Sequence, residues 1–119
     1  MARAAPILKP MLNQTAQAEL VFQALAIPSR RFIVDRLSSG PASVSELARP
    51  LRMSLAAVMQ HLRVLEDCGI VRSEKVGRVR ECRLGPATTL GEAGEWIEAH
   101  RRAWEGRLVR FGRFAEGAE

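Results

Sequence analysis

Apolar residues recur at spacings of three and four through most of the chain, a pattern typical of amphipathic helices. The pattern begins near Gln14 and is interrupted at Pro28, which suits the first turn of a new helix because its missing N–H would be unpaired there. We expect the second helix to end in the run Ser38-Ser39-Gly40-Pro41, since glycine followed by proline stops a helix. Residues 1–13 contain two prolines and little periodicity, which predicts a flexible arm followed by one folded domain over residues 14–115.

Two capping signals in the middle of the chain predict a helix-turn-helix. Ser43 and Glu46 have the spacing of a capping box, in which each side chain accepts a hydrogen bond from a backbone N–H of the first turn. Pro50 is expected to bend or end this helix, and Ser54, after a brief turn, to cap the start of the next one. Two helices joined by such a short turn make up the motif. The inward face of the second helix is expected to consist of Leu55, Val58, Leu62 and Leu65.

The pattern changes after Cys68-Gly69, which is expected to close the helix because glycine suits a left-handed cap. Two extended runs follow, Ile70 to Lys75 and Val79 to Leu84, and Gly77 between them supplies the positive φ of a tight hairpin. Helical spacing returns from about Leu90 to Phe114. The sequence therefore predicts a mostly α fold with a small β-hairpin wing, a winged helix-turn-helix in the order ααααββα.

Composition adds a basic character. The chain has 119 residues, of which 47% are hydrophobic, a net charge of +5 and a pI of about 10.5. A small basic domain favours a polyanionic partner, with nucleic acid as the first candidate. No apolar run approaches the length of a membrane span, and the N-terminus lacks the apolar core of a signal peptide. These features predict a cytoplasmic protein with no membrane partner.

The outward face of the helix over residues 54–67 is suited to the major groove of DNA. Small residues permit close approach, and Gln60 can form a bidentate pair with adenine. Cations on the hairpin over residues 70–84 can reach the neighbouring phosphates, Arg78 at its tip above all. A solvated polar helix face and a charged hairpin that resists aggregation are the alternative explanations. The residues expected to contact DNA are Ser54, Ala56, Ala57, Gln60, His61, Arg63, Lys75, Arg78 and Arg80.

Several segments together resemble the arsenic-repressor (ArsR/SmtB) family. They are Ile27 to Leu37, Val44 to Ala48, Met53 to Leu65, Cys68 to Val71, and Gly77-Arg78. The resemblance covers about residues 19–111 and is specific in combination. It implies a homodimeric regulator, usually a repressor, that binds double-stranded DNA, and an inverted-repeat operator would match such a dimer. In this family the first and last helices form the dimer interface, which here would comprise Val21, Phe22, Leu25, Trp96, Ile97, Trp104, Leu108 and Phe111.

The sensor sites of the family are not evident in this chain. Some members bind metal through cysteines in the first helix of the helix-turn-helix, where Ser45 to Arg49 contains none. Others use Asp and His along the final helix, where this chain has Glu92, Glu95, Glu98 and a single histidine, His100. We therefore expect no metal and no cofactor, and assign no inducer. Met59, where members often carry a serine that contacts DNA, is a further departure.

Two questions stay open at this level. Cys68 and Cys82 could form a redox pair if the fold brings them together, or could be small buried apolar residues. A winged-helix module that binds protein or RNA is the alternative to a DNA-binding regulator. Enzymatic activity is not expected, because the chain has no tyrosine, two separated histidines, no glycine-rich phosphate loop and no serine elbow.

Overall fold

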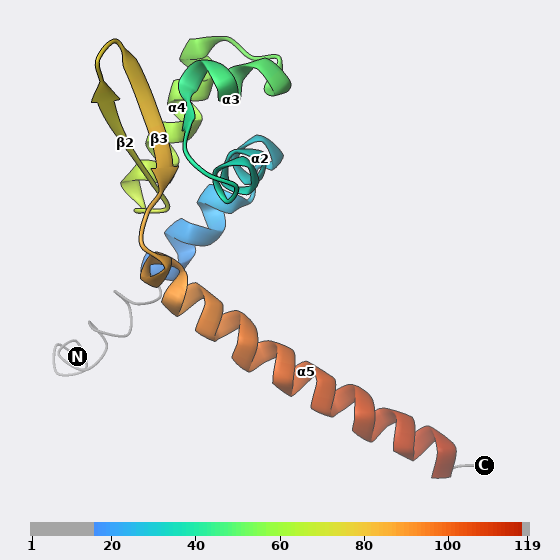
Figure 1. Cartoon of the computed structure of the whole chain (residues 1–119). Coiled ribbons are helices and arrows are strands. Elements are labelled where there is room, and N and C mark those ends of the chain that lie inside the picture. The colour runs from blue at the N-terminus through green and yellow to red at the C-terminus, as the bar shows by residue number, and fades with distance from the viewer. Residues whose placement is uncertain (1–15, 118–119) are drawn as a thin grey trace, which may run out of the picture.

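The structure is a computed structural model that describes the backbone of residues 16–117 and the side chains of residues 16–107. The expected winged helix-turn-helix is confirmed: four helices, a hairpin and a final helix occur in the predicted order (Figure 1). Two short elements were not expected, the strand β1 and the 3₁₀ helix η2. The arm expected over residues 1–13 lies outside the described residues. The elements are a helix over 16–25, α2 (Pro28–Leu37), β1 (Ala42–Ser43), α3 (Val44–Leu51), α4 (Leu55–Asp67), β2 (Val71–Val76), β3 (Val79–Leu84), η2 (Ala87–Leu90) and α5 (Gly91–Gly117).

The capping signals place the two helices of the motif as expected. Ser43 Oγ accepts a hydrogen bond from the backbone N–H of Glu46 at 3.1 Å, and the Glu46 carboxylate accepts one from the Ser43 N–H at 3.3 Å. Ser54 Oγ accepts from the Ala57 N–H at 3.1 Å and so caps α4. Helix α3 continues only one residue beyond Pro50, because this proline removes a hydrogen bond of the last turn of the helix.

The wing is a three-stranded antiparallel sheet in the order β1-β3-β2. Its hairpin pairs Val76 with Val79 across a two-residue turn, in which Gly77 has a φ of +65°. At the base, β1 pairs with β3 through Ala42 opposite Cys82 and Ser43 opposite Glu81. A two-residue strand leaves no periodicity in the sequence, so β1 could not be predicted. It ties the base of the wing to the start of α3.

The core lies between the first four helices and the base of the hairpin. Its fully buried side chains include Ile33 of α2, Leu47 of α3 and Leu62 of α4. Three of the four residues in the expected inward face of α4 are buried, but the prediction for Leu55 is wrong, because 54% of this residue is exposed. Leu55 is the first residue of α4. A row of apolar residues predicts which face of a helix points inward, but it does not predict over how much of its length the helix is covered by other elements.

The final helix α5 projects away from the rest of the fold (Figure 1). Ala93 in its first turn is buried, and the rings of Phe22 and Trp96 meet edge to face with their centroids 5.7 Å apart. Farther along α5 every described side chain from 101 to 107 is exposed. Within the described range, no helix combines the length and the apolar character that crossing a membrane requires.

Candidate nucleic-acid interface

The outward face of α4 carries an open hollow of about 620 Å³. Ser54, Ala56, Gln60 and Arg63 are exposed on it, whereas Ala57 and Met59 are half-buried. Five of the residues expected to contact DNA therefore lie together around one depression. Met59 also lines it, although the sequence marked this residue only as a departure from the family pattern.

The hollow is lined by the apolar side chains of Ala56, Ala57 and Met59 and by the polar side chains of Ser54, Gln60 and Arg63. Alanine and methionine side chains can contact the methyl group of thymine, a glutamine can pair with adenine, and an arginine with guanine or with a phosphate. At the start of α4 the first backbone N–H groups have no partner within the helix, and together with the Ser54 hydroxyl they form a site suited to a phosphate oxygen.

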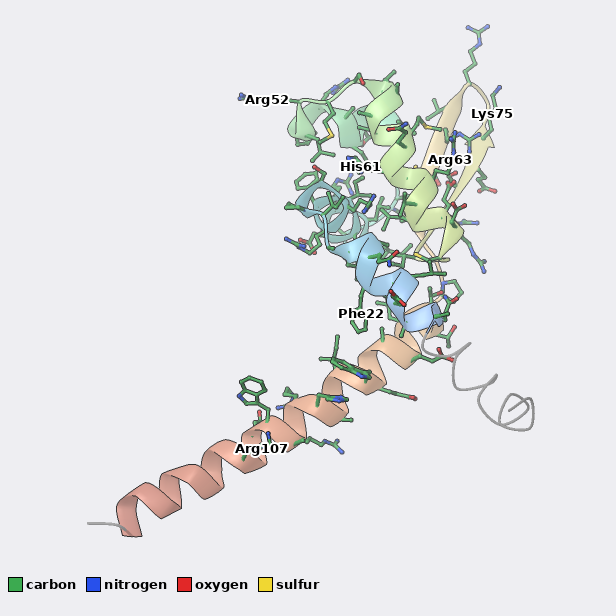
Figure 2. The ribbon with its side chains drawn as sticks, turned by 180° about the vertical axis from the view of Figure 1, so that it is seen from behind. Phe22, Arg52, His61, Arg63, Lys75 and Arg107 are labelled. Carbon is green, nitrogen blue, oxygen red and sulfur yellow. The ribbon has the colours of Figure 1, made fainter. Side chains whose placement is uncertain are left out.

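His61 occupies a different position from the other expected contact residues. It is half-buried and does not line the hollow. Figure 2 shows His61 and Arg63 on opposite sides of α4, with Arg63 toward the wing, as expected for residues two positions apart on a helix. The geometry therefore favours Arg63 over His61 as a contact of the reading face.

The three wing cations expected to contact DNA differ in whether they have a partner within the protein. Lys75 and Arg78 are exposed near the tip, and neither forms an ion pair with another described side chain. Arg80 instead donates a hydrogen bond to Ser73 Oγ at 2.9 Å, and the Ser73 hydroxyl donates to the Glu66 carboxylate of α4. The Arg80 side chain is thus engaged within the protein.

Arg52 is a candidate contact that the sequence analysis missed. It lies in the turn between α3 and α4 with a φ of 54° and a ψ of 39°, the left-handed conformation that usually belongs to glycine. Its side chain is exposed and points away from the fold at the end of α4 that lies far from the wing (Figure 2). The signal that could have identified Arg52 in the sequence is a basic residue at the expected end of a helix, two residues before the N-cap residue Ser54.

The residues expected at a dimer interface fall into four groups. Trp96, Ile97 and Trp104 are 53%, 50% and 70% exposed on α5 and line a shallow hollow with His100. Phe22 and Leu25 are half-buried. Val21 is only 1% exposed and packs in the chain's own core, so it has no surface left to contribute to an interface. The side chains of Leu108 and Phe111 lie outside the described part of the chain.

The candidate sensor residues have internal partners. His100 stacks on Trp96 at 3.9 Å between ring centroids, and Glu98 pairs with Arg101 and Arg102. Hydrogen bonding from Arg101 lowers the pKa of the Glu98 carboxyl below its usual value. No group of three potential metal ligands occurs in the part of the chain that the structure describes.

The two cysteines are buried and free. Cys82 is fully buried, and this burial, with the nearby Glu66 carboxylate, raises the pKa of its thiol to about 11. A neutral thiol is a poor nucleophile, because the reactive form is the thiolate. The environment of Cys82 therefore matches that of a small core residue.

Comparison with known proteins agrees with the winged helix-turn-helix fold. HTH-type transcriptional regulator Rv2034 of Mycobacterium tuberculosis is 48% identical over 65 residues, and the transcriptional repressor SmtB homolog of Synechocystis is 36% identical over 67 residues. These alignments cover 55% and 56% of this chain but only 61% and 51% of the two relatives. A solved ArsR family transcriptional regulator, RHA00566, is 43% identical over 76% of this chain and 93% of its own, with a TM-score of 0.69. All three are named as transcriptional regulators or repressors rather than enzymes, as the sequence analysis expected.

The model of the bacterial regulatory protein arsR family matches residues 28–73, which run from α2 through the helix-turn-helix into the first strand of the hairpin. Together with the likeness to RHA00566 over nearly its whole length, this match means that the chain belongs to the ArsR family.

Proposed function

We propose that the chain is a homodimeric transcriptional repressor of the cytoplasm that binds double-stranded DNA at an inverted repeat. The observation that carries the proposal is the hollow on α4, lined by Gln60 and Arg63. Arg52 in the turn before α4 and Lys75 on the wing are exposed on either side of this helix (Figure 2). In each half-site α4 enters the major groove, and the hairpin β2–β3 lies beside it along the backbone. The relative from Synechocystis named as a repressor supports the direction of regulation.

The roles of the residues follow from their positions. Gln60 reads an adenine, while Ala56, Ala57 and Met59 accept the methyl groups of neighbouring thymines. Arg63 contacts a base edge or phosphate on the side of the wing, and Ser54 binds a phosphate at the helix start. Lys75 and Arg78 of the wing neutralise phosphates, which adds affinity without sequence preference.

A second copy of the chain is the proposed partner of α5. Trp96 and Ile97, together with Trp104 about two turns farther along the helix, expose large apolar surfaces around one hollow. Contiguous exposed apolar surface of this kind marks an interaction site. Half-buried Phe22 already packs against Trp96, so the first helix and α5 would cover one interface together. A two-fold axis through this interface would present two α4 helices to the same face of DNA.

The experiment that tests the proposal is selection of bound duplexes from a random library by the purified protein at two salt concentrations. We expect an inverted repeat with half-sites one helical turn apart, roughly 34 Å. The Gln60→Ala variant should lose about 1–3 kcal/mol of binding free energy to the selected duplex and relax the preference at one base step in each half-site. Its matched control is Ser45→Ala, a change at an exposed polar residue of α3 outside the proposed interface, which should keep the full preference.

One result would overturn the proposal as a whole, and a second would overturn only the assignment of the reading face. Recovery of no duplex, or of all sequences equally, would favour a module that binds protein or RNA instead. An inverted repeat whose preference is unchanged by Gln60→Ala would retain the repressor but reject the proposed reading face.

A further inference from the structure

A chain of three polar side chains connects the recognition helix to the wing. Glu66 near the end of α4 accepts a hydrogen bond from the hydroxyl of Ser73 in β2, and Ser73 accepts one from Arg80 of β3 at 2.9 Å. The Ser73 side chain is half-buried. These contacts join all three elements of the proposed interface, α4 and both strands of the hairpin.

The position of these contacts along the hairpin gives them mechanical importance. Strand β1 supports only the base, where it pairs with Glu81 and Cys82. From residue 74 to residue 80, by contrast, every residue is exposed. Ser73 stands opposite Cys82 and so lies at the level of this base, on the strand that β1 does not pair with, and the exposed tip extends beyond it. A two-stranded hairpin has little stability without such support.

The charges explain why Arg80 turns toward Ser73. Arg80 stands directly opposite Lys75 in the antiparallel ladder, and like charges in such cross-strand pairs repel. The Glu66 carboxylate supplies the opposite charge on the other side of Ser73. Both charges lie close to the buried Cys82, since Glu66 raises and Arg80 lowers the pKa of that thiol.

We propose that Ser73 and Arg80 are positioning residues, which, through Glu66, hold the wing at a fixed angle to α4. The Arg80 side chain is then directed to Ser73 of its own chain and not to a DNA phosphate, in contrast to the sequence-based expectation for this residue. Lys75 and Arg78 reach the phosphates because the Glu66–Ser73–Arg80 contact keeps the tip in place. This inference rests on the proposed DNA-binding function.

Three variants of the full-length chain separate positioning from phosphate contact. Affinity for the selected duplex is measured against salt concentration for Ser73→Ala, Arg80→Gln and the control Lys75→Gln. We expect Ser73→Ala, which removes no charge, to weaken binding about tenfold without changing the salt dependence. Arg80→Gln should do the same, and the double variant should lose no more than either single one, because both changes break one contact. The control, at the cation opposite Arg80, should lower the salt slope by about one unit per protomer.

Conservative variants keep the test independent of folding. Ser73→Thr preserves the hydroxyl and suits a strand, so it should bind like the unchanged protein, and equal thermal midpoints for all variants would exclude global unfolding. Unchanged affinity in Ser73→Ala, or a fall in slope for Arg80→Gln equal to that of Lys75→Gln, would overturn the inference while leaving the proposed function intact. Failure of the unchanged protein to prefer any duplex would instead overturn the proposed function, and this inference with it.

Discussion

Replacing Arg52 with glycine is expected to stabilise the fold and to weaken DNA binding. Arg52 has a φ of 54°, and for a residue with a Cβ the left-handed conformation costs about 1–2 kcal/mol. Glycine removes this cost but adds about 0.5–1 kcal/mol of backbone entropy to the unfolded chain. The net expected gain is about 0.5–1 kcal/mol, which for a domain of this size raises the thermal midpoint by about 2–6 °C.

The same change removes an exposed guanidinium from the turn that precedes α4. If Arg52 contacts a phosphate, the salt slope of binding should fall by about one unit per protomer. Arg52→Ala is the matched control, because alanine also removes the guanidinium but keeps the Cβ and the strained conformation. Both variants should therefore bind DNA equally weakly, while only Arg52→Gly melts at a higher temperature than the unchanged protein.

Thermal unfolding must be compared at one protein concentration, since association shifts the apparent midpoint. A lower midpoint for Arg52→Gly than for Arg52→Ala would refute the assignment of strain to this residue. A salt slope unchanged in both variants would instead refute the phosphate contact, whatever the midpoints are.

Three further predictions concern the core, the interface and the thiols. Leu62→Ala should lower the free energy of unfolding by about 2–5 kcal/mol, and Leu55→Ala, at the exposed start of the same helix, by no more than about 0.5 kcal/mol; equal losses in chemical denaturation would contradict the burial pattern of α4. Trp104→Ala should raise the dissociation constant of the dimer at least about 30-fold in sedimentation equilibrium, whereas the control Arg102→Ala, nearly opposite on α5, should leave it unchanged. If neither variant changes this constant, the face of α5 that carries Trp104 is not the dimer interface. In the folded protein the raised pKa of Cys82, about 11 against a usual 9.0, keeps the thiol neutral, so the stability it confers is complete below pH 9 and is lost as the pH rises through 11. Peptide mapping after iodoacetamide treatment at pH 9 should accordingly find Cys82 alkylated in denaturant but protected without it, and equal labelling would show that the site is open.

Much of the fold follows from local signals in the sequence. The capping residues Ser43 and Ser54 act on backbone groups within three positions, and Gly77 acts within its own turn, so each signal can be recognised without knowing the rest of the fold. The order of helices and strands was predictable for the same reason. Strand β1 was not, because its two residues form a strand only through pairing with β3, some forty positions later.

The candidate site was predictable where one helix carries it. Gln60 and Arg63 share a face of α4 by helical periodicity alone, and both line the hollow. The hydrogen bond of Arg80 to Ser73 was not predictable, because it depends on strand register, and the link to Glu66 depends on how the hairpin packs against α4. The expectation that Val21 lies at the dimer interface does not match its burial for a related reason. Periodicity identifies an apolar face of a helix but does not distinguish the core of one chain from an interface between two chains.

The residues that break local rules lie on or next to the surfaces proposed to meet a partner. Leu55 is exposed beside the start of α4, Arg52 holds a left-handed conformation in the preceding turn, and Lys75 stands opposite another cation in the wing. On α5, Trp104 leaves 70% of its surface open to water. Each arrangement is unfavourable for the isolated chain; DNA would offset the charge repulsion at Lys75, and a second copy would cover the apolar surface of Trp104. Natural sequences tolerate such conflicts chiefly at functional sites. Here Lys75 and Trp104 belong to the surfaces proposed for DNA and for the dimer, and Arg52 and Leu55 lie within two residues of Ser54, which lines the hollow on α4.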